Sequence, residues 1–123
     1  MANILLMGLE LPTREELHRV LVEQGHTVSL ERHDALSTVD TVFCNGDQPG
    51  YRALVSHIRA FRPDLPVVVV TRLPEMTRWL DALEVGAADY CSTPFESIQI
   101  RWLLSAVLGQ PVAEPAAPVL VQA

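Results

Sequence analysis

Short apolar segments alternate along the chain with longer amphipathic ones. Residues 66–71 form a β-branched apolar run without polar alternation, which is typical of a strand buried on both faces. Other apolar segments of strand length stand at Asn3–Met7, Thr27–Leu30 and Thr41–Asn45, and a short fifth one leads into residues 92–95. The pattern therefore predicts five strands, each followed by a segment that can form a helix.

Four helices and one helical stub are predicted after these strands. A capping box at Thr13 and Glu16 predicts the start of the first helix, and Gly25 favours its end. Only ten residues separate Leu30 from Thr41, so the second helix is expected to be a stub near residues 34–39. The remaining helices are predicted from apolar stripes at helical spacing, at residues 49–60, 75–85 and 96–108.

This order of elements predicts an α/β domain over residues 1–109. It favours a flavodoxin-like (βα)5 three-layer sandwich, with parallel strand order 2-1-3-4-5 and a shortened second helix. From residue 110 the composition shifts to proline and alanine, so residues 110–123 are predicted to be a C-terminal tail or linker. In such a sheet, ligands and chemistry belong at the carboxyl ends of the strands.

Composition limits the kinds of partner and the cellular location that we expect for this protein. The formal net charge of −6 argues against nucleic acid as a direct partner. The apolar stretches fall short of a membrane span and the start of the chain lacks the pattern of a signal peptide, so we expect no membrane contact and a cytoplasmic protein. All nine basic side chains are arginines, which excludes any mechanism that needs a lysine ammonium.

Histidine and cysteine chemistry is not indicated. Neither residue type shows metal-ligand spacing or a known nucleophile motif at its positions, which are His18, His26, His33, His57, Cys44 and Cys91. Both cysteines lie within strand patterns, where cysteine behaves as a small buried hydrophobe. The sequence therefore predicts no metal site and no cofactor.

Residues 63–95 carry a resemblance to a known family. Together with the first and third predicted strands, they make residues 3–108 resemble a receiver domain of the bacterial two-component response regulators. The resemblance implies a phosphoryl relay, in which an aspartate that ends the third strand accepts phosphate from a histidine kinase. It also implies Mg²⁺ held by two acidic residues after the first strand, a lysine after the fifth strand, and a switch pair of a Thr or Ser with an aromatic residue.

The residues at the matching positions lack that chemistry. In place of the two acids, the acceptor aspartate and the lysine, the chain has Gly8, Leu9, Asn45 and Thr93. None of these side chains offers a carboxylate or an ammonium group, whereas Thr71 and Tyr90 match the switch pair. The chain is therefore interpreted as a pseudo-receiver with a degenerate phosphorylation site. It is predicted to be a non-enzymatic signalling module that the usual Mg²⁺-dependent mechanism does not phosphorylate.

Other interpretations of these strand ends stay open. Glu10 and Asp47 lie near the lost acids and are candidate ligands for a weakly bound cation. Asp47 as a displaced acid would give an active phosphorelay receiver, and deamidation of Asn45 before Gly46 would create an aspartate. A flavodoxin-like binder of a small ligand or nucleotide is the remaining alternative, although residues 8–12 lack the Gly, Ser and Thr richness that cradles phosphate.

The predicted helix at residues 96–108 has two apolar stripes. One stripe should face the core, and the other, formed by Ile98, Trp102 and Ala106, falls where a monomer should be polar. An exposed row that contains tryptophan predicts contact with a protein partner or a homodimer, through the face of the fourth helix, fifth strand and fifth helix. The alternative is that residues 119–121 of the tail cover this row.

Overall fold

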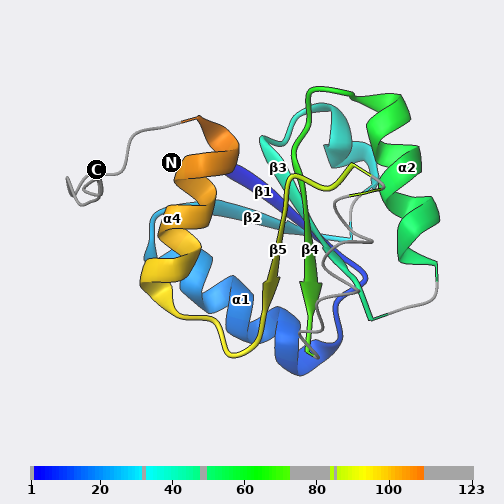
Figure 1. The fold of residues 1–123 in the computed structure, drawn as a ribbon. Helices are drawn as coiled ribbons and strands as arrows, with labels where there is room; N and C mark the ends of the chain where they lie inside the picture. Colours follow the sequence, from blue (N-terminus) through cyan, green and yellow to red (C-terminus); the bar gives the residue numbers. More distant parts are fainter. Residues whose placement is uncertain (1, 32, 48–49, 73–83, 85, 110–123) are drawn as a thin grey trace, which may run out of the picture.

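The chain forms a parallel sheet of five strands between two layers of helices (Figure 1). The computed structural model describes residues 2–31, 33–47, 50–72, 84 and 86–109. The strands are β1 (Asn3–Met7), β2 (Thr27–Leu30), β3 (Thr41–Asn45), β4 (Val67–Thr71) and β5 (Asp89–Ser92). Their order in the sheet is β2-β1-β3-β4-β5, and every neighbouring pair is parallel. The predicted fold class and strand order are confirmed.

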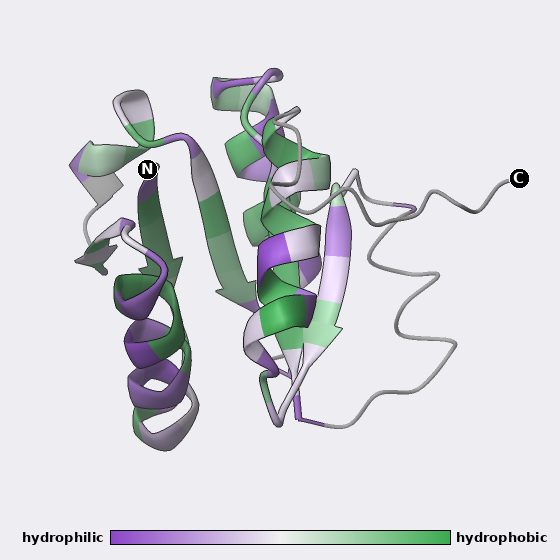
Figure 2. Ribbon diagram, turned by 90° about the vertical axis from the view of Figure 1, so that its left-hand side faces the viewer, coloured by the Kyte–Doolittle hydropathy of each residue, from purple (hydrophilic) through white to green (hydrophobic). Residues whose placement is uncertain are grey.

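The central strands are buried on both faces because helices cover both sides of the sheet. Every residue of β3 and of β4 is buried, whereas the edge strands β2 and β5 are partly exposed. Figure 2 shows hydrophobic residues along the central strands and hydrophilic ones on the outer side of α1 (Leu11–Glu23). The uninterrupted apolar runs of the sequence therefore reflect a sheet that lies inside the molecule.

Alternate side chains of each strand divide the core into two clusters. Helices α1 and α4 (Ser97–Leu108) pack on one face of the sheet, over strand residues such as Leu6 and Val68. Helix α2 (Tyr51–Phe61) and the 3-10 helix η1 (His33–Ser37) pack on the other face. Successive strand residues point to opposite faces, so both clusters draw on the same strands.

Apart from the start of α1, the predicted helices agree with the structure where it describes them. Helix η1 is the expected stub, and α2 and α4 start one or two residues from the predicted bounds. The helix predicted at residues 75–85 lies outside the described residues except at position 84, and the tail 110–123 lies wholly outside them. Within the described part of the chain, no helix is long and apolar enough to cross a membrane.

The predicted capping box at the start of α1 is wrong. The helix begins at Leu11, its N-cap is Glu10, and no side chain caps it by a hydrogen bond. Thr13 is instead buried in the first turn. The Glu16 carboxylate accepts a hydrogen bond from the Phe95 main-chain N–H at 3.0 Å, and so joins α1 to the segment after β5.

Candidate functional site

The carboxyl ends of β1, β3, β4 and β5 meet at one edge of the sheet. Pairing of Asn45 with Val70 and of Thr71 with Ser92 brings the ends of β3, β4 and β5 together. The Thr93 main-chain N–H donates to the Thr71 carbonyl at 3.2 Å. The residues that sequence reasoning assigned to the degenerate phosphorylation site therefore lie along the same edge.

Asn45 joins the ends of β1 and β3 through its side-chain amide. Its Nδ2 donates to the Gly8 carbonyl at 2.9 Å, and its Oδ1 accepts from the Asp47 main-chain N–H at 2.7 Å. Asn45 is only 6% exposed, so both bonds are shielded from water. An amide side chain can donate and accept at once, whereas an ionised carboxylate could only accept.

Gly46 lets the chain cross β4 at close range. Its main-chain N–H donates to the Val70 carbonyl at 2.7 Å. A Cβ at this position would lie 2.4 Å from Cγ1 of Val69, so any larger residue would push the turn away from the strand. This close approach places Asp47 beside the end of β4, where Thr71 stands.

The Asp47 carboxylate is the centre of the polar contacts at this edge. It accepts hydrogen bonds from the Thr71 hydroxyl and, at 2.9 Å, from the Arg72 main-chain N–H. The Arg72 Nε lies 3.5 Å from the same carboxylate. The Asp47 side chain is 15% exposed, so these contacts act in a partly desolvated place, where hydrogen bonds to an ionised group are strong.

Arg72 is the site residue that sequence reasoning missed. Besides Asp47, its guanidinium contacts the Glu10 carboxylate at 3.2 Å and so spans the loops after β1 and β3. Arg72 and Glu10 are both about half exposed, and an exposed pair of this kind adds little stability by itself. The available signal was its position directly after Thr71, at a strand end that faces two nearby acids.

The donor set does not fit the Mg²⁺ that the receiver resemblance implies. Gly8 has no side chain, and the Leu9 side chain is buried in the core. Glu10 and Asp47 both contact Arg72, so a cation between them would have to displace a guanidinium; this cation site stays a prediction. Among the described residues, no group of three or more His, Cys, Asp or Glu is placed to hold a metal ion.

Thr71 and Tyr90, the predicted switch pair, lie on the same face of the sheet. Tyr90 pairs with Val69, two residues before Thr71, and packs on the cluster under α2. The Tyr90 hydroxyl oxygen is buried. The structure thus places the two side chains as diagonal neighbours on adjacent strands, with Thr71 donating to Asp47.

Helix α4 exposes the apolar row predicted from the sequence. Ile98 is 55% exposed, Trp102 is 42% exposed, and Ala106 is also exposed. On the opposite side of the same helix, the core-facing residues are Ile100, Leu103 and Leu104. A partner for this row stays a prediction, and the tail that could cover it lies outside the described residues.

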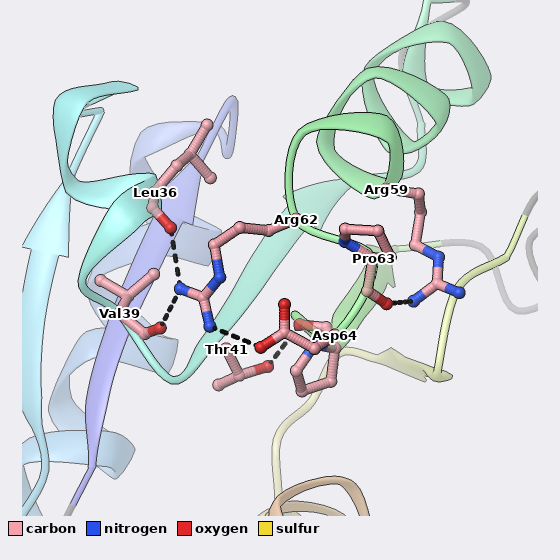
Figure 3. Close-up of polar contacts among 8 residues, drawn as sticks. Leu36, Val39, Thr41, Arg59, Arg62, Pro63 and Asp64 are labelled. Carbon is pink, nitrogen blue, oxygen red and sulfur yellow. Dashed lines mark hydrogen bonds and ion pairs between the residues drawn. The ribbon is translucent and has the colours of Figure 1, made fainter.

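A second polar cluster lies at the opposite edge of the sheet and is built around Arg62 (Figure 3). Arg62 donates to the carbonyls of Leu36 and Val39 at 3.0 and 2.9 Å, and contacts the Asp64 carboxylate at 3.2 Å. The hydrogen bond from Arg62 lowers the pKa of the Asp64 carboxyl. These bonds satisfy carbonyls at the end of η1, so the cluster joins η1 to the end of α2.

The cysteines and histidines add no reactive group to the described sites. Cys44 and Cys91 are buried and form no disulfide, and burial raises the pKa of both thiols to about 12. Burial also lowers the pKa of His26, whose Nδ1 accepts from the Ala2 main-chain N–H at 3.0 Å. The cysteines are thus core residues, as predicted.

Known proteins resemble this chain in sequence over most of its length. The response regulator protein FleR of Pseudomonas aeruginosa is 31% identical over 132 aligned positions, which include 98% of this chain and 28% of that protein. The DNA-binding transcriptional regulator NtrC of Rhizobium meliloti is 28% identical, over 93% of this chain and 25% of that protein. The chain spans about a quarter of the length of these relatives. No family model matches it.

Solved structures share the fold at lower identity. A response regulator from Thermotoga maritima superposes with a TM-score of 0.76 at 18% identity, over 88% of this chain and 98% of that one. NtrX from Brucella abortus superposes with a TM-score of 0.79 at 23% identity, over 88% of this chain and 27% of that one. The sequence relatives and these neighbours together support a response regulator receiver domain.

Proposed function

We propose that this receiver-like domain is a cytoplasmic signalling module that acts through protein contacts, without Mg²⁺-dependent phosphorylation of an aspartate. The contacts of Asn45 carry the proposal. At the place of the acceptor, the side chain is an amide, which is a poor nucleophile. Its two polar atoms are already bonded to Gly8 and to the Asp47 main chain, and it is almost fully buried.

The surroundings of Asn45 support the same conclusion. Catalysis of phosphoryl transfer rests on cations that neutralise the developing charge of the phosphoryl group. Thr93 supplies no charge at the position of the lysine. The guanidinium of Arg72, which lies at this edge, contacts two carboxylates. A phosphoryl group at Asn45 would therefore meet little positive charge.

The exposed row on α4 supports contact with another protein. Ile98 and Trp102 are four residues apart, about one helical turn, and so lie on the same face, and Ala106 follows after another four residues. Exposed tryptophan is enriched where proteins bind one another, because its large ring loses much hydrated surface on contact. We propose that a protein partner, or a second copy of this chain, covers the row.

Phosphorylation can be tested by intact-mass measurement after incubation with acetyl phosphate and Mg²⁺. We expect the mass to stay unchanged, while a receiver with an intact acceptor aspartate gains one phosphoryl group in the same assay. A gain by the native chain that the Asp47→Asn variant lacks would contradict the proposal and support an active receiver with a displaced acid. A rise in melting temperature with nucleotide would support the ligand-binding alternative instead.

Protein contact can be tested by changing Trp102. If a homodimer forms through the α4 row, Trp102→Glu should increase the elution volume in size-exclusion chromatography to that of a monomer. Phe61→Glu is the matched control, because Phe61 is an exposed aromatic residue on α2, 56% exposed. If the native chain is already monomeric, labelled native chain should capture a partner that Trp102→Glu does not. Equal behaviour of both variants in both measurements would refute the proposed surface.

A further inference from the structure

We propose that the Asp47 carboxylate is an internal anion, which occupies an oxyanion-binding cluster made of the chain's own donors. The donor cluster consists of the Thr71 hydroxyl, the Arg72 main-chain N–H and the Arg72 guanidinium. By filling this cluster, Asp47 holds the carboxyl edge of the sheet in one arrangement without an external ligand. This role of Asp47 rests on the proposed function, in which no phosphoryl group has to bind at this edge of the sheet.

The three donors are of the kinds that bind oxyanions. A hydroxyl, a main-chain N–H and a guanidinium all donate to carboxylate, phosphate or sulfate oxygens, and such charge-assisted bonds are about twice as strong as neutral ones. Thr71 and Arg72 are consecutive, so the end of one strand supplies the whole cluster. The direction of the carboxylate is fixed as well, because the Asp47 N–H is bonded to the Asn45 side chain.

The cavity that the described residues form at this edge is too small for an external anion while Asp47 is in place. This cavity, lined by residues at the ends of β1, β3 and β4, has a volume of about 10 Å³, roughly the room that a single water needs. Its lining includes Leu9, Glu10, Thr13, Asn45, Asp47, Val70 and Arg72. A phosphate ion is several times larger than a water. It could fill this cavity only in place of the Asp47 carboxylate.

The internal anion also acts on the switch pair. The Thr71 hydroxyl donates to Asp47, on the same face of the sheet where the Tyr90 ring is packed and its hydroxyl is buried. A tethered carboxylate competes at a high effective concentration, so it keeps this bond formed in the absence of any ligand. The pair is thus held in one state, and a signal through α4 would not need phosphorylation.

The test removes the internal anion and offers an external one. In Asp47→Ala, titration with inorganic phosphate at constant ionic strength should give a saturable shift of the Arg72 amide resonance in NMR spectra. The native chain should show no such shift. Asp64→Ala is the matched control, because it removes a carboxylate that pairs with an arginine at the opposite edge of the sheet. The proposal would be overturned if phosphate does not shift the Arg72 amide resonance of Asp47→Ala, or if it shifts that resonance equally in Asp64→Ala.

A second variant covers the case in which Asp47→Ala does not fold. Asp47→Asn keeps the shape of the side chain and removes its charge. Amide hydrogen exchange at Arg72 should then be about tenfold faster than in the native chain, because a bond to an ionised acceptor is lost. Unchanged exchange would show that the charge of Asp47 does not hold this edge. A negative result in these experiments would not change the intact-mass result, so the internal-anion proposal and the proposed function can fail independently.

Discussion

Asn45→Asp tests whether an amide is required at the end of β3. The substitution replaces the Nδ2 donor with a carboxylate oxygen, 2.9 Å from the Gly8 carbonyl. The bond from the Asp47 N–H can persist, since a carboxylate still accepts. One bond is therefore lost, a partly buried carbonyl is left without it, and a charge is placed where the native residue is 6% exposed. We expect the free energy of unfolding at neutral pH to fall by roughly 2 kcal/mol or more.

Urea denaturation of both chains measures this loss, and its pH dependence identifies the cause. A protonated carboxyl can donate to the Gly8 carbonyl again, so the folded state should bind this proton more tightly than the unfolded state. The deficit should therefore be largest near neutral pH, shrink as the pH falls through the raised pKa of the folded state, and be smallest below about pH 4. Asn3→Asp makes the same change at an exposed position and should cost less than about 0.5 kcal/mol. Equal stability of Asn45→Asp and the native chain at neutral pH would refute the bridging role of the amide.

Two further predictions concern contacts away from this edge. Arg62→Met removes the donor to the Leu36 and Val39 carbonyls and should lower the free energy of unfolding in urea by about 2 kcal/mol, whereas an unchanged value would mean that water replaces the guanidinium. Burial lowers the pKa of His26 from 6.5, so the unfolded chain binds this proton more tightly than the folded chain. The contribution of neutral His26 to the free energy of unfolding should therefore be complete above about pH 6.5 and be lost as the pH falls. His26→Gln should flatten the stability profile between about pH 7 and 5, and a profile parallel to that of the native chain would rule out His26 as its cause.

Local pattern was sufficient for most of the fold. The run at residues 66–71 is β4 because β-branched apolar residues without alternation suit a strand covered on both faces. The ten residues before β3 could hold no more than η1. Gly25, with φ of +89°, follows the end of α1 as expected, since glycine adopts the left-handed conformation at little cost.

The start of α1 shows where local pattern was insufficient. A capping box at Thr13 was a sound local solution, yet Pro12 favours the first turn of a helix and the helix begins before it. Glu16 finds its partner in Phe95, which is 79 residues away in the sequence. The local pattern therefore missed the partner of Glu16, which the distant segment after β5 supplies.

For the candidate site, the sequence by itself determined which side chains stand at the strand ends, and it predicted that the acceptor, the acids and the lysine of a receiver are replaced at the matching positions. Only the tertiary structure decided how the remaining polar groups pair. The sequence singled out Asp47 but gave no reason to pair it with Arg72, and the two meet because Gly46 lets the loop after β3 pass close to β4. Strand positions follow from periodicity, which is local. Pairing between loops follows from the paths of the chain in space, and periodicity carries no information about those paths.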